Sequence, residues 1–264
     1  MEFCYVLSSS PADTYYEQFL LSLTSLKLVL PGAQVVLLCD EKTAGGLYGN
    51  RGSHGRFISR QVVCKTPDNM RAHEAAPAML CSLNRHVQGE FLYLHCDTII
   101  CEAPNDLSVL GIDYGACLEG GPGAKQYSTA LIYSSGSPET HRFFGRWNEL
   151  WSNSFRWGTH QSGPSFNEAL AEDPSLFTAL PPWWNCPINA GGLPHLAQAR
   201  IIHYNASLPA AKKGPYLLGR ESVLLDIKHQ GQVPPEVLDL LQNPRGAFHP
   251  QTRLALGPEK RRWF

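Results

Sequence analysis

The stretch that decides the fold runs from Glu90 to Glu102 and reads E-F-L-Y-L-H-C-D-T-I-I-C-E. Phe91 to Leu94 form a short apolar run, which is typical of an inner strand of a parallel sheet. Successive side chains of a strand point to opposite faces, so His95 and Asp97 should share one face, with Cys96 on the other. Open α/β sheets bind ligands at the carboxyl ends of their strands. The two side chains could therefore converge on one ion, or the strand could simply end in solvent.

The composition sets wide limits on the function. The chain has 264 residues and a net charge of −1. This suits one large α/β domain, or one domain with an appendage, and gives no reason to expect nucleic acid as a partner. No apolar run reaches the roughly 18 residues that span a bilayer. The first residues, Met1 to Tyr5, lack the basic and apolar regions of a signal peptide, so we expect a cytoplasmic protein.

The eight cysteines are scattered, and no pair has the C-x-x-C spacing of a zinc or redox site. Several lie in expected strands, among them Cys4, Cys39, Cys64 and Cys96. Buried free thiols in a reducing compartment explain this distribution best. We therefore expect neither a disulfide framework nor a zinc site.

Strands and helices alternate before the central stretch. The pattern predicts strands over Phe3 to Ser8, Gln34 to Cys39 and Phe57 to Lys65, and helices over Tyr15 to Leu30 and about Met70 to Val87. This βαβ order predicts a mostly parallel sheet with right-handed crossovers, flanked by helices. The fold class is therefore α/β, with a Rossmann-like central sheet.

The pattern changes after the central stretch, and the chain ends in a helical, basic segment. We expect a nucleotide-binding domain over residues 1–208 and a helical extension over residues 209–264. The extension should pack on the domain, because it contains leucines and valines at helical spacing that need burial. Its basic end could be a solvated terminus or a peripheral membrane contact through anionic lipids.

The sequence limits how a nucleotide could be held. It contains neither a G-x-x-x-x-G-K-[ST] loop nor a G-x-G-x-x-G turn after the first strand, which disfavours a P-loop enzyme and a dinucleotide-binding domain. A metal site remains possible. His95, Asp97 and His203, each at an expected strand end, could supply three ligands, although a His in an apolar strand is more often a hydrogen-bonded core residue. Mixed imidazole and carboxylate ligands suit Mn²⁺ better than Mg²⁺.

Six motifs, in their order and spacing, resemble those of GT-A fold glycosyltransferases, specifically nucleotide-diphospho-sugar transferases related to the family-eight retaining enzymes. The motifs are Asp13-Thr14-Tyr15-Tyr16, Asn69-Met70-Arg71, Tyr93 to Ile100, Pro164 to Glu168, Trp184-Asn185-Cys186 and Ile201 to Tyr204. The resemblance implies a GT-A fold and a retaining transfer of a sugar from a nucleoside diphosphate donor, UDP-linked, to a hydroxyl of a glycan or a lipid-linked acceptor.

The resemblance also implies roles for individual residues. Asp97 would be the main ligand of a divalent metal, Mn²⁺ rather than Mg²⁺, with His95 and His203 in support. The phosphate partners would be Arg71 and Lys212. Tyr15 or Tyr16 would contact the base, whereas the other tyrosine would be a core aromatic. Trp183 and Trp184 could fill a core or form a wall for the sugar.

Four departures from the family pattern leave a second hypothesis open, and one is the late Lys-Pro-Trp, which appears here as Lys212-Lys213-Gly214-Pro215-Tyr216. His95 replaces the first of two metal-binding aspartates. The usual Asp-Gln pair appears as Ser162-Gly163, unless His160-Gln161 takes its place, and the usual Asn-x-Gly appears as Ser128-Thr129-Ala130. The alternative is therefore a catalytically inert GT-A domain that binds a nucleotide sugar or a glycan.

Overall fold

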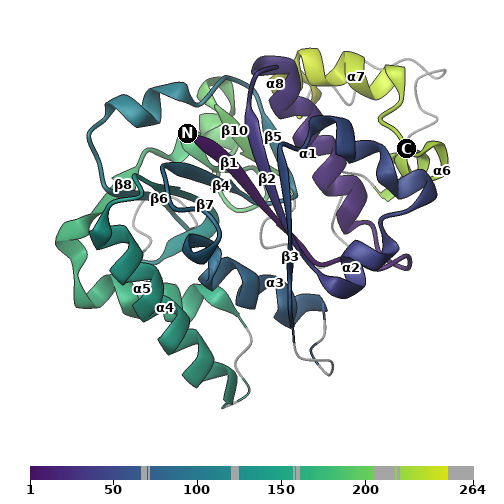
Figure 1. The fold of residues 1–264 in the computed structure, drawn as a ribbon. Coiled ribbons are helices and arrows are strands. Elements are labelled where there is room, and N and C mark those ends of the chain that lie inside the picture. Colours follow the sequence, from purple (N-terminus) through teal and green to yellow (C-terminus); the bar gives the residue numbers. More distant parts are fainter. Residues whose placement is uncertain are drawn as a thin grey trace.

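The computed structural model describes residues 1–66, 70, 72–119, 125–156, 158, 161–204, 218 and 221–248. Seven strands form the central sheet (Figure 1): β1 (Glu2–Leu7), β2 (Gln34–Asp40), β3 (Arg60–Cys64), β4 (Phe91–Leu94), β6 (Tyr114–Leu118), β7 (Tyr127–Ser134) and β8 (Phe177–Leu180). Their order is β3-β2-β1-β4-β7-β6-β8. Strand β7 runs antiparallel to both neighbours, and the other adjacent pairs are parallel. The expected mostly parallel sheet is confirmed.

A second, smaller sheet continues the chain beyond the central strand. It contains β5 (Thr98–Ile100), β9 (Cys186–Pro187) and β10 (Ile201–His203), in the order β5-β10-β9. Strand β10 is antiparallel to β5 and parallel to β9. The segment 95–97 is thus a turn between two sheets and not the end of one long strand. This turn, and not the alternation of a strand, decides where His95 and Asp97 point.

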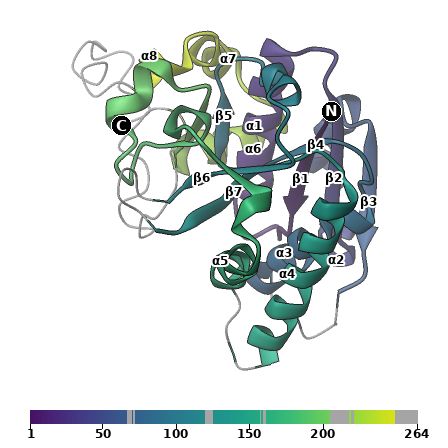
Figure 2. The ribbon, with the colours of Figure 1, turned by 90° about the vertical axis from the view of Figure 1, so that its left-hand side faces the viewer.

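Helices cover both faces of the central sheet, as Figure 2 shows. The α-helices are α1 (Tyr15–Val29), α2 (Glu41–Gly46), α3 (Ala72–Cys81), α4 (Pro138–Arg156), α5 (Ser162–Glu172), α6 (Glu221–Gln230), α7 (Pro235–Gln242) and α8 (Pro244–Ala247). Short 3₁₀ segments join them: η1 (Gly49–Phe57), η2 (Leu83–Arg85), η3 (Asn105–Val109), η4 (Pro174–Leu176), η5 (Pro182–Trp184) and η6 (Leu193–Gln198). The third strand starts at Arg60 and not at Phe57, because η1 takes up the preceding residues.

The alternation of side chains in the strands gives the sheet two hydrophobic cores. On β1, Phe3, Tyr5 and Leu7 pack in one core with α1, α6, α7 and the small sheet. Cys4 and Val6 point the other way, into a core with α3, α4 and α5. All eight cysteines are free, as expected, and burial raises the pKa of the Cys4 and Cys96 thiols far above their usual range.

The described part of the extension packs against the first of these cores. Leu224 and Ile227 of α6 and Val237 of α7 are buried there, together with Phe248. Leu225 is an exception, with 39% of its surface exposed. The basic end of the extension, for which a membrane contact is predicted, lies outside the described residues. Among the described helices, none is both long and apolar enough to cross a membrane.

Candidate active site

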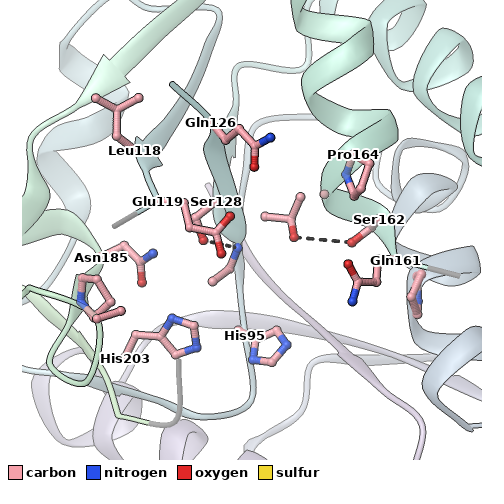
Figure 3. A pocket seen from close by; sticks show the side chains of 16 residues that line it. His95, Leu118, Glu119, Gln126, Ser128, Gln161, Ser162, Pro164, Asn185 and His203 are labelled. Carbon is pink, nitrogen blue, oxygen red and sulfur yellow. Dashed lines mark hydrogen bonds between the residues drawn. The ribbon is translucent and has the colours of Figure 1, made fainter. Parts of the chain in front are cut away.

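The sheet reverses its strand order between β1 and β4, and a cleft opens beside the carboxyl end of β4. The chain leaves β1 towards β2 and β3, then returns to place β4 on the other side of β1. Such switch points are the usual ligand sites of open α/β sheets. An open cavity of about 690 Å³ lies on the β4 side of this point, lined by the turn after β4, by β7, by the start of α5 and by the small sheet. Figure 3 shows His95 and His203 side by side at its floor, with Gln161 and Ser162 on one wall and Asn185 on the other.

Three predicted metal ligands meet at this floor. His95 and Asp97 come from the turn after β4, and His203 from the end of β10, where it pairs with Thr98 of β5. One oxygen of the Asp97 carboxylate contacts both imidazoles: Nδ1 of His95, and Nε2 of His203 at 3.0 Å. The ligand atoms of the three residues lie within 4.8 Å of one another. The small sheet therefore brings together residues that are distant in sequence.

The electrostatics of this cluster suit a cation. Burial alone would raise the pKa of Asp97, but the two histidines beside it hold that pKa well below its usual range. The carboxylate is therefore ionised even though the residue is only 6% exposed. His95 is half-exposed, which leaves the cluster open to the cleft. A buried carboxylate and two imidazoles on one side of an open space form a donor set that fits a divalent transition metal.

Cys96, which lies between two of these residues, takes no part in the cluster. Its side chain points away from His95 and Asp97, and its Sγ donates to the backbone oxygen of Val6 at 3.4 Å. This contact ties the turn to β1.

Neutral polar side chains line one wall of the cleft. Ser128 and Thr129 come from β7, and Gln161 and Ser162 from the start of α5. The hydroxyls of Thr129 and Ser162 lie 3.4 Å apart. The two alternatives for the missing Asp-Gln pair thus converge, because Gln161 and Ser162 both reach the cleft. His160 lies outside the described residues.

Asn185 forms part of the opposite wall, and the sequence predicted no individual role for it. It is only 2% exposed, and its Oδ1 is a buried acceptor with no hydrogen-bond partner among the described residues. Buried acceptors of this kind are rare in folded proteins. In the sequence, only its place in the Trp184-Asn185-Cys186 motif marks Asn185.

The neighbouring tryptophans belong to the core and do not form a wall of the cleft. Trp184 is 4% exposed and carries the Arg200 guanidinium 4.6 Å from its ring centroid. Trp183 is partly buried against the same core. Of the two alternatives that the sequence left open for this pair, core packing is the one found.

The two candidate base-binding tyrosines have different environments. Tyr16 is 1% exposed, and its hydroxyl lies 3.1 Å from Nδ1 of His54. Its ring packs against Phe19, so it offers no face to a base. Tyr15 is 45% exposed. Base contact by Tyr15 stays a prediction, and Tyr16 is the core aromatic of the pair.

The two predicted phosphate partners, Arg71 and Lys212, both lie outside the described residues. Their roles stay predictions. Sequence reasoning also missed Arg51 of η1, which is 8% exposed and contacts the loop that follows β1. No local motif marks this arginine.

Solved glycosyltransferases share this architecture at low sequence identity. The galactosyltransferase LgtC, in complex with donor and acceptor sugar analogs, matches with a TM-score of 0.57 and 14% identity over 90% of this chain and 99% of that one. The chain has the GT-A glycosyltransferase fold. Mouse xyloside xylosyltransferase 1 matches with a TM-score of 0.52 and 11% identity, over 79% of this chain and 98% of that one. These likenesses confirm the fold that the motifs predicted.

A third solved structure, the glycosyltransferase GlyE of Streptococcus pneumoniae TIGR4, matches with a TM-score of 0.56 and 14% identity. The match covers 86% of this chain and 60% of the length of GlyE. No protein-family model matches the chain, and neither does any curated protein sequence.

Proposed function

We propose that the protein is a glycosyltransferase that moves a sugar from a UDP-linked donor to a hydroxyl of a glycan or a lipid-linked acceptor. The observation that carries the proposal is the cluster of His95, Asp97 and His203 at the floor of an open cleft. The cluster lies at the switch point of a GT-A sheet. Its charge suits a cation, and the cleft leaves room for a donor and an acceptor.

The residues of the cleft would have two different roles, metal binding and sugar binding. Asp97 would hold a divalent metal with His95 and His203 in support, and the donor set favours Mn²⁺ over Mg²⁺. When bound, such a metal supplies positive charge for the leaving diphosphate. Gln161 and Ser162 are placed to donate and accept hydrogen bonds with sugar hydroxyls. Retention at the anomeric carbon is proposed from the resemblance alone.

The test uses purified protein with a panel of UDP-sugars and Mn²⁺, and it measures UDP release and transfer to sugar acceptors. Asp97→Asn keeps the size of the side chain and removes its charge. The matched control is Asp239→Asn on the exposed side of α7. We expect UDP release by the parent and by the control, and loss of release in Asp97→Asn.

The alternative is a GT-A domain that binds a nucleotide sugar without transferring it. The replacement of the first aspartate by His95 favours this alternative, since it removes one negative charge from the metal shell. UDP-sugar binding without UDP release, for every sugar in the panel, would support the binding domain and contradict the enzyme. Failure to bind any UDP-sugar would contradict both.

A further inference from the structure

We propose that Arg51 of η1 and Lys228 of α6 are positioning residues for the donor nucleotide. They hold the loop formed by residues 8–14, which follows β1, so that Tyr15 stays in place to stack on the base. The inference rests on the proposed function and deepens it, because it makes a helix of the C-terminal extension part of the donor site.

Every nitrogen of the Arg51 guanidinium donates to the loop or to the start of α1. Nη1 donates to the backbone oxygen of Ser10 at 2.6 Å and to Oγ of Ser9 at 3.3 Å. Nη2 donates to the backbone oxygen of Asp13 at 2.7 Å and to Oε2 of Glu17 at 3.0 Å, and Nε donates to Oε1 of Glu17 at 3.1 Å. Only the planar fork of an arginine can make these bonds together.

Lys228 reaches the same loop from the far end of the chain. Its Nζ donates to the backbone oxygen of Pro11 at 2.6 Å and to that of Asp13 at 2.9 Å. Carbonyl oxygens in a loop have no hydrogen-bond donors from regular secondary structure. Here the Arg51 guanidinium and the Lys228 ammonium act as the donors. The loop is thus held from η1 on one side and from α6 on the other.

Several hydrogen-bond donors of the loop also bond to other groups of the protein. The Asp13 carboxylate accepts from Oγ of Ser9 at 2.6 Å and from the backbone N–H groups of Ser10 at 2.7 Å and Tyr15 at 3.0 Å. The N–H of Ser9 donates to Oγ1 of Thr43. These three N–H groups therefore bond within the protein, and the Tyr15 ring, which directly follows the loop, is exposed to a ligand.

The loop lies at the same edge of the sheet as the cluster of His95, Asp97 and His203. It starts one residue after β1, which is hydrogen-bonded to β4, and Cys96 ties the turn after β4 back to Val6 of β1. A nucleotide with its diphosphate at Asp97 would have its base along this edge. Stacking of a base on an aromatic ring is worth roughly 5- to 150-fold in affinity, and that gain is reduced if the ring must first be ordered.

The test is a double-mutant cycle on UDP affinity, measured by calorimetry for the parent, Tyr15→Ala, Lys228→Met and the double variant. We expect Lys228→Met to weaken UDP binding about 3- to 10-fold, and the double variant to bind no more weakly than Tyr15→Ala. Pyrophosphate, which has no base, should bind Lys228→Met and the parent equally. Lys228→Arg should restore UDP affinity, since it keeps a donor at this position.

Lys27→Met is the matched control. Lys27 also donates to a backbone carbonyl, that of Ala33 at 2.7 Å, but at the opposite end of α1. The UDP affinity of Lys27→Met should equal that of the parent. Arg51→Lys is a second test variant, which should lower UDP affinity and spare pyrophosphate, provided that its melting curve shows a folded protein.

Three results would overturn the inference. UDP affinity could be unchanged in both Lys228→Met and Arg51→Lys, or the losses in the double variant could simply add. Either outcome would leave the proposed function standing, because the parent still binds UDP. A parent that binds no UDP would instead overturn the proposed donor, and the positioning role with it.

Discussion

The floor and the wall of the cleft are built from different chemistry. At the floor, His95, Asp97 and His203 are ionisable, and the carboxylate between the histidines is held ionised. The wall formed by β7 and α5 offers neutral hydroxyl and amide groups, such as those of Ser128 and Gln161, and the Glu119 side chain, which follows β6, lies beside Ser128 (Figure 3). A carboxylate flanked by imidazoles suits a metal ion, and a diphosphate would bind there through that metal, whereas neutral donors and acceptors suit sugar hydroxyls. The proposed function therefore assigns the diphosphate to the floor and the sugar to the wall.

The largest expected effect tests the floor. Asp97→Asn should lower the rate of transfer by about 100-fold or more, because it removes the negative charge that binds the metal. Mutating a residue that only hydrogen-bonds to a metal ligand already costs about 10- to 100-fold in metal affinity or activity. UDP affinity in Mn²⁺ should fall to its value in chelator. Activity assays and calorimetry with and without chelator measure both, and an unchanged, metal-dependent affinity in the variant would contradict the floor assignment.

His95→Asp tests which metal the floor selects. Magnesium prefers oxygen ligands, whereas imidazole suits transition metals. The variant should therefore gain activity in Mg²⁺ relative to Mn²⁺, by about tenfold in the ratio of the two rates. The control is His229→Asp on the exposed face of α6. Equal ratios in the parent and both variants would show that His95 does not ligate the metal.

Gln161→Ala tests the wall. Loss of a neutral hydrogen bond to a sugar hydroxyl is worth about 0.5–1.5 kcal/mol, so transfer should slow by up to about tenfold. UDP affinity should stay at the parent value, since the wall does not contact the diphosphate in our assignment. Gln242→Ala at the exposed end of α7 is the control. A fall in UDP affinity for Gln161→Ala would remove the distinction between floor and wall.

A substitution at Asn185 tests whether this residue serves substrate binding or folding. Because its buried Oδ1 has no partner among the described residues, Asn185→Leu should leave the free energy of unfolding unchanged or raise it by about 1 kcal/mol. Transfer should fall if a substrate hydroxyl is the missing partner. Urea unfolding and the transfer assay measure the two effects, and a clear loss of stability would mean that Asn185 serves the fold.

The smallest expected effect is an acid dependence of stability at the floor. The folded-state pKa of Asp97 is below its unfolded value, so the unfolded chain binds more protons as the pH falls. The stability that Asp97 contributes is present above its unfolded pKa of about 3.9 and is lost as the pH falls through the folded pKa. The difference in unfolding free energy between the parent and Asp97→Asn should therefore be constant above about pH 5 and should shrink as the pH falls below about 4. A difference that stays constant below about pH 4 would contradict the shift.

Local patterns in the sequence determined the architecture. Apolar runs and helical stripes predicted the βαβ order, because hydrophobic periodicity is set by the geometry of each element alone. The polar end of the central strand marked the edge that carries the site, and the motif spacing indicated the GT-A fold. The sequence could single out His95, Asp97 and His203 as candidate ligands because each stands at the end of an apolar run, which is a local signal.

Tertiary contacts decided the surroundings of the other candidate residues. The sequence could not choose between Tyr15 and Tyr16, because either could face the core at the start of a helix. The contacts of Tyr16 with Phe19 and His54 made that choice. Arg51 carries no motif and is buried only because the loop after β1 and the start of α1 fold around it. Burial and hydrogen-bond partners depend on residues far apart in the chain, and no local period encodes them.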